Sequence, residues 1–375
     1  MYYFDNAATT KPSKSALDKA QKFNDELFYN PSAIYHFGLE NNKEIKTCKD
    51  KILQALGVIN GKYEVIFTSC GSESDNQAIF CSVKRGCFVT SLGEHSAVYQ
   101  SFKELKQKNN TVYFAKLNKD GSVNVDDLIF YCKENKVDFV SIMHVNNETG
   151  AINDVNDIAR KLKAINPKII FHADGVQAFC KIPFRMSEYI DMYSISAHKI
   201  NALKGVGALI KKRTINLSPL IFGGGQENGY RSGTENLFGI KVFEYAIEEH
   251  FNSIDKNYDY VKSLKSYLLD NLDKNLFTVI SGEHSSPYIL SVSAKSLKGE
   301  IITHSLEEFD IIIGNGSACS SKNPFSRVIK ECGYSNEILG GVIRISFSKE
   351  NTIEQVKYLT EKLNLITRNL KEKIL

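Results

Sequence analysis

The chain has 375 residues, too many for one ordinary hydrophobic core, which favours about two domains. Its 47 basic and 43 acidic side chains nearly balance, and no Lys/Arg block indicates nucleic-acid binding. No window approaches the roughly 18 to 20 unbroken apolar residues of a membrane-spanning helix, and the N-terminus lacks a signal-peptide pattern. We therefore expect a cytoplasmic protein without membrane or nucleic-acid partners.

The first half of the chain alternates short apolar runs with amphipathic stretches from about residue 63 onward. Predicted strands lie, in chain order, at 63–69, 87–92, 112–117, 137–143, 168–173 and 191–196. Predicted helices between them lie at 73–84, after residue 95, at 124–135 and at 154–165. Near-continuous apolar strands separated by helices are typical of a mainly parallel sheet covered on both faces. Such sheets bind ligands at the carboxyl ends of their strands.

The second half follows a different pattern. A long helical stretch is predicted over about 235–275, followed by strands at 288–294, 309–314 and 342–348, a helix at 298–307 and an amphipathic C-terminal helix. This order predicts a smaller α+β domain. We expect the large domain to comprise residues 13–250, and the small domain to comprise residues 1–12 and 251–375.

Three features at predicted strand ends belong together chemically. Lys199 follows a strand in DMYSISAHK, and Asp174 follows another in FHADGVQ, where a carboxylate can pair with a pyridinium nitrogen. TSCGSES leads into a helix, whose N-terminal N–H groups and Ser72 form a phosphate cradle. A lysine, a partner aspartate and a phosphate cradle are what pyridoxal 5'-phosphate requires.

The eight cysteines form no CxxC pair, and no histidine pair has metal-ligand spacing, so the sequence predicts mostly free thiols and no metal site. One of them, Cys319, stands among glycines and serines in GNGSACSS. That stretch alone is compatible with an indifferent loop or with a loop whose task is to move the thiol.

A dozen short motifs resolve this choice. They include, in order, FDNAATT, NPS, EHSAV, VNNETGAI, HADGVQ, SAHK, KGVGAL, GGGQE, RSGTEN, GSACSS and IRISF. With these motifs the chain resembles the NifS/IscS-type cysteine desulfurases, which belong to the class V aminotransferases. The resemblance implies an α/β aspartate-aminotransferase-like fold (PLP fold type I) with a mainly parallel seven-stranded sheet. It also implies pyridoxal 5'-phosphate as the cofactor and a homodimer with shared active sites.

The resemblance implies a role for each residue around the cofactor ring. Lys199 would bind the cofactor covalently and later move protons, and Asp174 would pair with the pyridine nitrogen. His95 would stack on the ring. Gln177 and Asn147 would lie beside the ring hydroxyl.

The same resemblance implies which residues bind the phosphate of the cofactor. Gly71, Ser72, Ser196 and His198 would hold it within one subunit. Thr234, in RSGTEN, would reach the phosphate of the partner subunit.

The substrate of the family is L-cysteine. Asn30 and Arg344 would bind its carboxylate, for which a guanidinium fork is suited. Cys319 would be the catalytic nucleophile that takes the sulfur, leaving L-alanine and an enzyme persulfide. A protein acceptor would then receive the sulfur for iron–sulfur cluster assembly or for tRNA or cofactor thiolation.

Two other functions stay open at this point. A selenocysteine lyase, or another class V lyase or transaminase, would use the same Lys199, but neither selenium release nor amino transfer requires the thiol of Cys319. A non-catalytic scaffold that retains the fold would be expected to have lost Lys199, Asp174, His95 or Cys319, and all four are present.

The chain also departs from the family pattern. Cys70 and Cys180 stand where glycine is common, and Tyr35 stands where histidine is usual. Ala202 and Leu203 replace a common Gly-Pro pair after the lysine. The change at Tyr35 removes no group to which chemistry is assigned.

Overall fold

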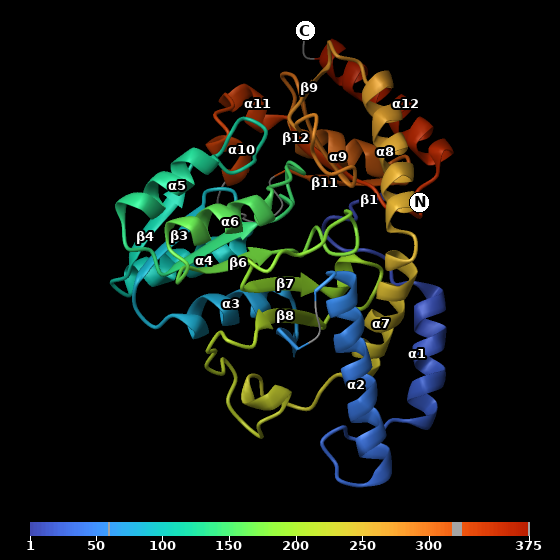
Figure 1. Ribbon diagram of the computed structural model, residues 1–375. Helices are drawn as coiled ribbons and strands as arrows, with labels where there is room; N and C mark the ends of the chain where they lie inside the picture. The colour runs from blue at the N-terminus through green and yellow to red at the C-terminus, as the bar shows by residue number, and fades with distance from the viewer. Residues whose placement is uncertain (59–60, 317–324, 374–375) are drawn as a thin grey trace.

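The computed structural model describes residues 1–58, 61–316 and 325–373 (Figure 1). A seven-stranded sheet lies at its centre, in the order β2-β8-β7-β6-β5-β3-β4. Its strands are β2 (Tyr63–Thr68), β3 (Cys87–Ser91), β4 (Thr111–Ala115), β5 (Phe139–Met143), β6 (Ile170–Asp174), β7 (Met192–Ser196) and β8 (Gly207–Lys212). β8 runs antiparallel to both of its neighbours, and the other adjacent pairs are parallel. The predicted mainly parallel seven-stranded sheet is confirmed.

Helices cover both faces of this sheet because its strands are apolar on both sides. In β2, Val65 and Phe67 belong to one hydrophobic core and Ile66 belongs to another, as the alternation of side chains along a strand requires. The first core includes residues of α1 (Lys14–Glu26), α2 (His36–Ala55), α5 (Val125–Glu134), α6 (Val155–Ile165) and α7 (Leu237–Phe251). The second includes residues of α3 (Gly71–Ser82) and α4 (Ser96–Gln107).

A smaller sheet lies at one end of the molecule (Figure 1). Its strands follow the order β1-β11-β12-β10-β9. They are β1 (Tyr2–Phe4), β9 (Phe277–Val279), β10 (Ile289–Ala294), β11 (Ile311–Asn315) and β12 (Val342–Ser346). β1 pairs in parallel with β11, so the first residues of the chain complete a sheet formed by its last third. The domain boundaries given above stay a prediction.

The helices of this end are α8 (Ile254–Asn271), α9 (Gly299–Glu307), α10 (Arg327–Glu331), α11 (Asn336–Gly340) and α12 (Ile353–Glu372). The helical stretch predicted over about 235–275 consists of two helices, because α7 ends at Phe251 and α8 begins at Ile254. None of the helices in the described ranges is long and apolar enough to cross a bilayer.

Candidate active site

The carboxyl ends of several strands of the large sheet meet β12 and the first loop of the chain around one cavity of about 340 Å³. Asp174 ends β6, Ser196 ends β7, and Lys199 follows in the short turn Ala197–Lys199. The lining residues are Ala7, Ala8, Cys70, Gly71, Ser72, Asp75, His95, Met143, Asn147, Asp174, Val176, Gln177, Ser196, His198, Lys199 and Arg344. The structure therefore brings together every predicted site residue except Asn30, Thr234 and Cys319.

These three residues are placed differently. Asn30 lies in the exposed segment between α1 and α2, and its side-chain oxygen accepts a hydrogen bond from the Ser32 N–H at 2.9 Å, so it does not line the cavity. Thr234 lines a separate pocket of about 130 Å³. Cys319 lies outside the residues that the structure describes.

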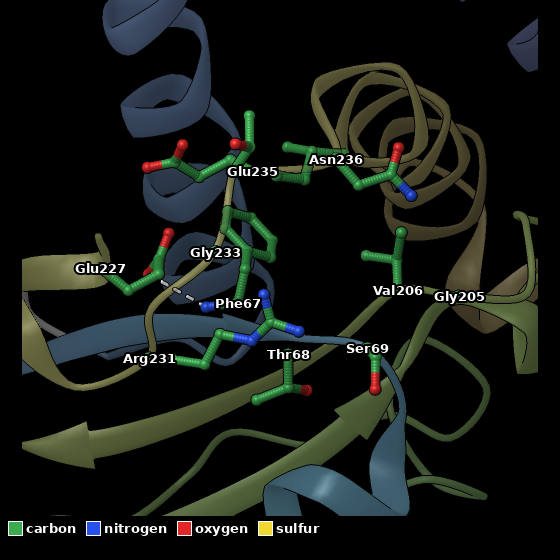
Figure 2. Close-up of a pocket in the computed structure, with 12 residues that line it drawn as sticks. Phe67, Thr68, Ser69, Gly205, Val206, Glu227, Arg231, Gly233, Glu235 and Asn236 are labelled. Atoms are coloured by element: carbon green, nitrogen blue, oxygen red, sulfur yellow. Dashed lines mark hydrogen bonds between the residues drawn. The ribbon is translucent and has the colours of Figure 1, made fainter. Parts of the chain in front are cut away.

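The Thr234 pocket is the one shown in Figure 2. It lies between the end of β2 and the segment 227–236, where the Glu227 carboxylate accepts a hydrogen bond from the Phe67 N–H at 3.0 Å. Ser69 lines this pocket and the next residue, Cys70, lines the large cavity. The two pockets therefore lie on either side of the chain that leads into α3.

Lys199 is held at the edge of the cavity by main-chain oxygens. Its Nζ donates hydrogen bonds to the carbonyl oxygens of Ala7 at 2.6 Å and Ala8 at 2.7 Å. Because β1 leads into these residues, the small sheet and the large sheet both fix the position of the amine.

Two buried carboxyl groups face the cavity. Burial raises the pKa of Asp174, and the nearby His95 and Lys199 oppose that rise. Burial and then the charge of Asp174 raise the pKa of Asp75 well above its ordinary value. Asp75 Oδ1 accepts no hydrogen bond from any described residue. A cation bound in the cavity would stabilise both carboxylates, and the protonated ring nitrogen of pyridoxal phosphate is such a cation.

Another part of the cavity lining is suited to an anion. No side chain caps the N-terminus of α3, which begins at Gly71, and within the described ranges the buried Ser196 Oγ has no hydrogen-bond partner. A Cβ atom on Gly71 would lie 2.7 Å from Val176 Cγ2, so a larger residue would fill the cradle. The positive end of the helix and the free hydroxyl fit a phosphate.

His198 also lines the cavity. Its Nδ1 lies 3.1 Å from the hydroxyl of Thr9. Burial, followed by the charges of Lys199, Lys181 and Lys204, lowers the pKa of His198 to about 4. It is therefore neutral near pH 7 and can offer one N–H to an anion.

His95 is fixed in one tautomer by the start of α4. It is the N-cap residue, and its Nδ1 accepts a hydrogen bond from the Ala97 N–H at 3.2 Å. Burial lowers the pKa of His95, so the ring is neutral at pH 7 and carries its proton on Nε2. Nε2 can therefore donate that proton to a group in the cavity.

Arg344 projects from β12 toward the cavity. Its guanidinium donates to Asp5 Oδ1 at 2.7 Å and to the carbonyl oxygen of Asn147 at 2.9 Å. The buried Nε has no acceptor among residues 1–58, 61–316 and 325–373. The fork is thus held in place while retaining donor capacity, as carboxylate binding requires.

The structure adds Asp75, Glu94, Lys181 and Arg327 to the residues that sequence reasoning identified. Asp75 lies one helical turn after Gly71, so both residues are on the face of α3 that lines the cavity. The helix predicted after the phosphate-cradle motif could therefore have identified Asp75. Glu94 directly precedes His95 in the EHSAV motif and is fully buried. Lys181 contacts Gln177, four residues before it, and Arg327 is brought by folding to the chain before His95.

The comparisons with known proteins agree with this geometry. Residues 2–359 match the family "Aminotransferase class-V". A relative described as "Cysteine desulfurase IscS", from Dictyoglomus turgidum, is 34% identical over 379 residues, covering 98% of this chain and 95% of the relative. A solved structure described as a NifS-like protein has a TM-score of 0.90 at 32% identity and covers 97% of this chain and 98% of that chain. Another, "SspA in complex with cysteine", has a TM-score of 0.80 at 27% identity, covering 94% and 100%. The chain therefore belongs to the class V aminotransferase family, among its NifS/IscS-type cysteine desulfurases.

Proposed function

We propose that the protein is a cysteine desulfurase that uses pyridoxal 5'-phosphate to convert L-cysteine into L-alanine and an enzyme persulfide on Cys319. The observation that carries the proposal is the single cavity in which Lys199, the buried Asp174 and the uncapped start of α3 meet. Lys199 would hold the cofactor covalently, Asp174 would pair with the ring nitrogen, and the cradle at Gly71 would take the phosphate. The bound cofactor supplies an electron sink for the charge that develops at the substrate Cα.

The substrate carboxylate would bind to Arg344, whose buried Nε–H donates to no acceptor of the described residues. Asn30 is proposed as a second carboxylate ligand, although in this chain its oxygen already binds the Ser32 N–H. Lys199 Nζ would remove the proton from the substrate Cα. The Nε2–H of His95 provides a second proton in the cavity.

The sulfur-transfer step involves two thiols, that of Cys319 and that of the substrate. The Cys319 thiolate forms a bond to the substrate sulfur while the bond between that sulfur and the substrate Cβ breaks. The electron pair stays with the three-carbon product, which takes up a proton to become alanine. Cys319 retains the extra sulfur as a persulfide, which passes to a protein acceptor.

Surface features support the proposed homodimer, in which Thr234 would reach the partner's phosphate. Large apolar side chains are exposed in two segments at the end of the molecule opposite the small sheet (Figure 1). They are Phe28, Ile34, Tyr35, Phe37, Leu39, Ile221 and Phe222. The second segment leads toward Thr234. Contiguous exposed apolar surface is typical of subunit interfaces, so exposed apolar side chains shortly before Thr234 in the chain support an interface there.

The direct test is to incubate the purified protein with pyridoxal phosphate and L-cysteine and to measure alanine and released sulfide. Borohydride reduction should fix the cofactor to the peptide that contains Lys199, and Lys199→Ala should abolish both the adduct and turnover. Alanine formed only from selenocysteine would favour the lyase. Amino transfer without sulfide would favour a transaminase, and the absence of an adduct at Lys199 would favour a scaffold.

A further inference from the structure

Lys181 is a buried lysine beside the proposed active site, and the proposed reaction assigns it no role. It is 4% exposed, and its Nζ donates a hydrogen bond to Gln177 Oε1 at 3.0 Å. No carboxylate of the described chain forms an ion pair with it, and the ring of Tyr288 lies 5.9 Å from Nζ. Burial, with the charges of Lys199 and Arg344, lowers the pKa of Lys181 to about 7.

A buried amine with one side-chain acceptor contributes little to stability, because its desolvation is poorly compensated. Lys265 provides the contrast in the same chain. Its Nζ donates to the Ser285 hydroxyl and to the carbonyl oxygens of Ser286 and Ile289, and it thereby joins α8 to the loop before β10. Lys265 has the contacts of a structural lysine, whereas the polar contact of Lys181 is directed at a residue of the cavity.

The contact fixes the direction of the Gln177 amide. In its protonated form, which predominates at pH values below its pKa of about 7, Lys181 only donates, so the amide oxygen faces it. The amide nitrogen, Gln177 Nε2, then donates to the Ala7 carbonyl oxygen at 2.8 Å, and the same oxygen accepts from Lys199 Nζ at 2.6 Å. Reversing the amide would place N–H groups against the ammonium and an oxygen against the Ala7 carbonyl. Both contacts would be repulsive.

Gln177 lines the cavity, and Nε2 has a second hydrogen that the Ala7 carbonyl does not use. We propose that Lys181 is a positioning residue that holds the Gln177 amide so that it offers an N–H, and not an oxygen, to the bound cofactor. This inference rests on the proposed function, because it takes pyridoxal phosphate as the occupant. It links Lys181, Gln177, Ala7 and Lys199 in one hydrogen-bonded series.

The test is a double-mutant cycle with two readouts: the dissociation constant of pyridoxal phosphate and the wavelength of its absorption band on the protein. Lys181→Met keeps the length of the side chain and removes the donor. We expect it to weaken cofactor binding about tenfold and to shift the band, since only the Ala7 carbonyl then opposes reversal of the Gln177 amide. In a Gln177→Met background, the same change should have almost no further effect. Lys181→Arg, which keeps a cationic donor, should restore the wild-type band.

Lys265→Met is the matched control and should leave both readouts unchanged, whatever it does to the melting temperature. A wild-type band and affinity in Lys181→Met, or equal effects of Lys181→Met with and without Gln177, would overturn the inference. Should Lys181→Met fail to fold, Lys181→Gln decides by the same criteria, because a neutral amide cannot fix Gln177 in one direction. Wild-type protein that binds no pyridoxal phosphate would instead refute the proposed function.

Discussion

Arg327 donates a hydrogen bond to the main-chain oxygen of Glu94 at 2.6 Å, which joins the first residue of α10 to the residue directly before His95. A second guanidinium nitrogen binds the carbonyl oxygen of Leu92, and the guanidinium carbon lies 3.8 Å from the centre of the Tyr99 ring. The start of α10, shortly after Cys319 in the chain, is thus anchored on the backbone that presents His95.

This anchor predicts a defect in turnover more than in cofactor binding. Arg327→Met removes both hydrogen bonds, and we expect kcat for alanine formation to fall about tenfold, because small losses of alignment are costly in catalysis. Arg327 does not line the cavity, so the affinity for pyridoxal phosphate should stay close to that of the wild type. Arg327→Lys should be intermediate. Arg368→Met, which removes an exposed partner of Asp273, is the control, and an unchanged kcat in Arg327→Met would contradict the anchor.

His144 predicts a pH-dependent loss of stability in the protein without cofactor. Burial lowers its pKa to about 3, and its Nδ1 lies 2.8 Å from the Tyr193 hydroxyl. Because the folded-state pKa is below the ordinary value of about 6.5, the neutral ring is favoured on folding, and this contribution is lost as pH falls below 6.5. Relative to His144→Gln, the wild type should lose about 2 kcal/mol of unfolding free energy between pH 7 and pH 5.

Urea unfolding at the two pH values measures that difference. A difference between wild type and His144→Gln that is the same at both pH values would show that His144 is not held neutral by burial.

At position 180 we expect the glycine variant to be more stable than the alanine variant, the reverse of the order expected inside a helix. The φ of Cys180 is 54°, in the left-handed region, which costs a residue with a Cβ about 1 kcal/mol and glycine almost nothing. The free energy of unfolding of Cys180→Gly should therefore be about 1 kcal/mol higher than that of Cys180→Ala. At Cys48, buried within α2, the order should be reversed by a similar amount, since glycine is unfavourable inside a helix. The same order at both positions would refute the strain at Cys180.

The proposed shared site predicts complementation between inactive subunits. Lys199→Ala and Thr234→Val should each lose activity. A mixed dimer should contain one intact site, with Lys199 from one subunit and Thr234 from the other, so mixing should restore turnover. Native mass spectrometry verifies subunit exchange. Proven exchange without recovered activity would refute the role of Thr234 in the partner's site.

The fold was predictable where strands are apolar on both faces, as in β3, β5 and β7. β8 was not predicted, because its end carries Lys211 and Lys212. In the structure, Lys211 is buried in an ion pair with Glu64 at 2.6 Å, a partner that sequence periodicity does not reveal. The helices α1 and α2 were also not predicted, since their exposed faces weaken the apolar pattern.

The candidate site was predictable to the extent that its residues follow strands. Lys199 and Asp174 do so, and the edge of the sheet brings them to one cavity. Arg327 has no such signal, because folding brings it beside a segment that is distant in the chain. Lys181 lies only four residues after Gln177, but its position in the sequence does not reveal that its amine is buried. For Asn30 the motif assigns a role in substrate binding, but the motif does not show where the side chain lies. In the structure, the hydrogen bond from the Ser32 N–H holds the side chain in the local turn.

Mass spectrometry of the protein after treatment with L-cysteine shows whether Cys319 receives the sulfur. We expect one added sulfur atom on the peptide containing Cys319, no such mass without L-cysteine, and no alanine formation by Cys319→Ser, because a serine hydroxyl forms almost no alkoxide near neutral pH, whereas a thiol forms some thiolate. The same variant should still bind pyridoxal phosphate, since Lys199 and Asp174 are unchanged. An added sulfur on Cys70 or Cys180 in place of Cys319, or full turnover by Cys319→Ser, would show that Cys319 is not the residue that receives the sulfur.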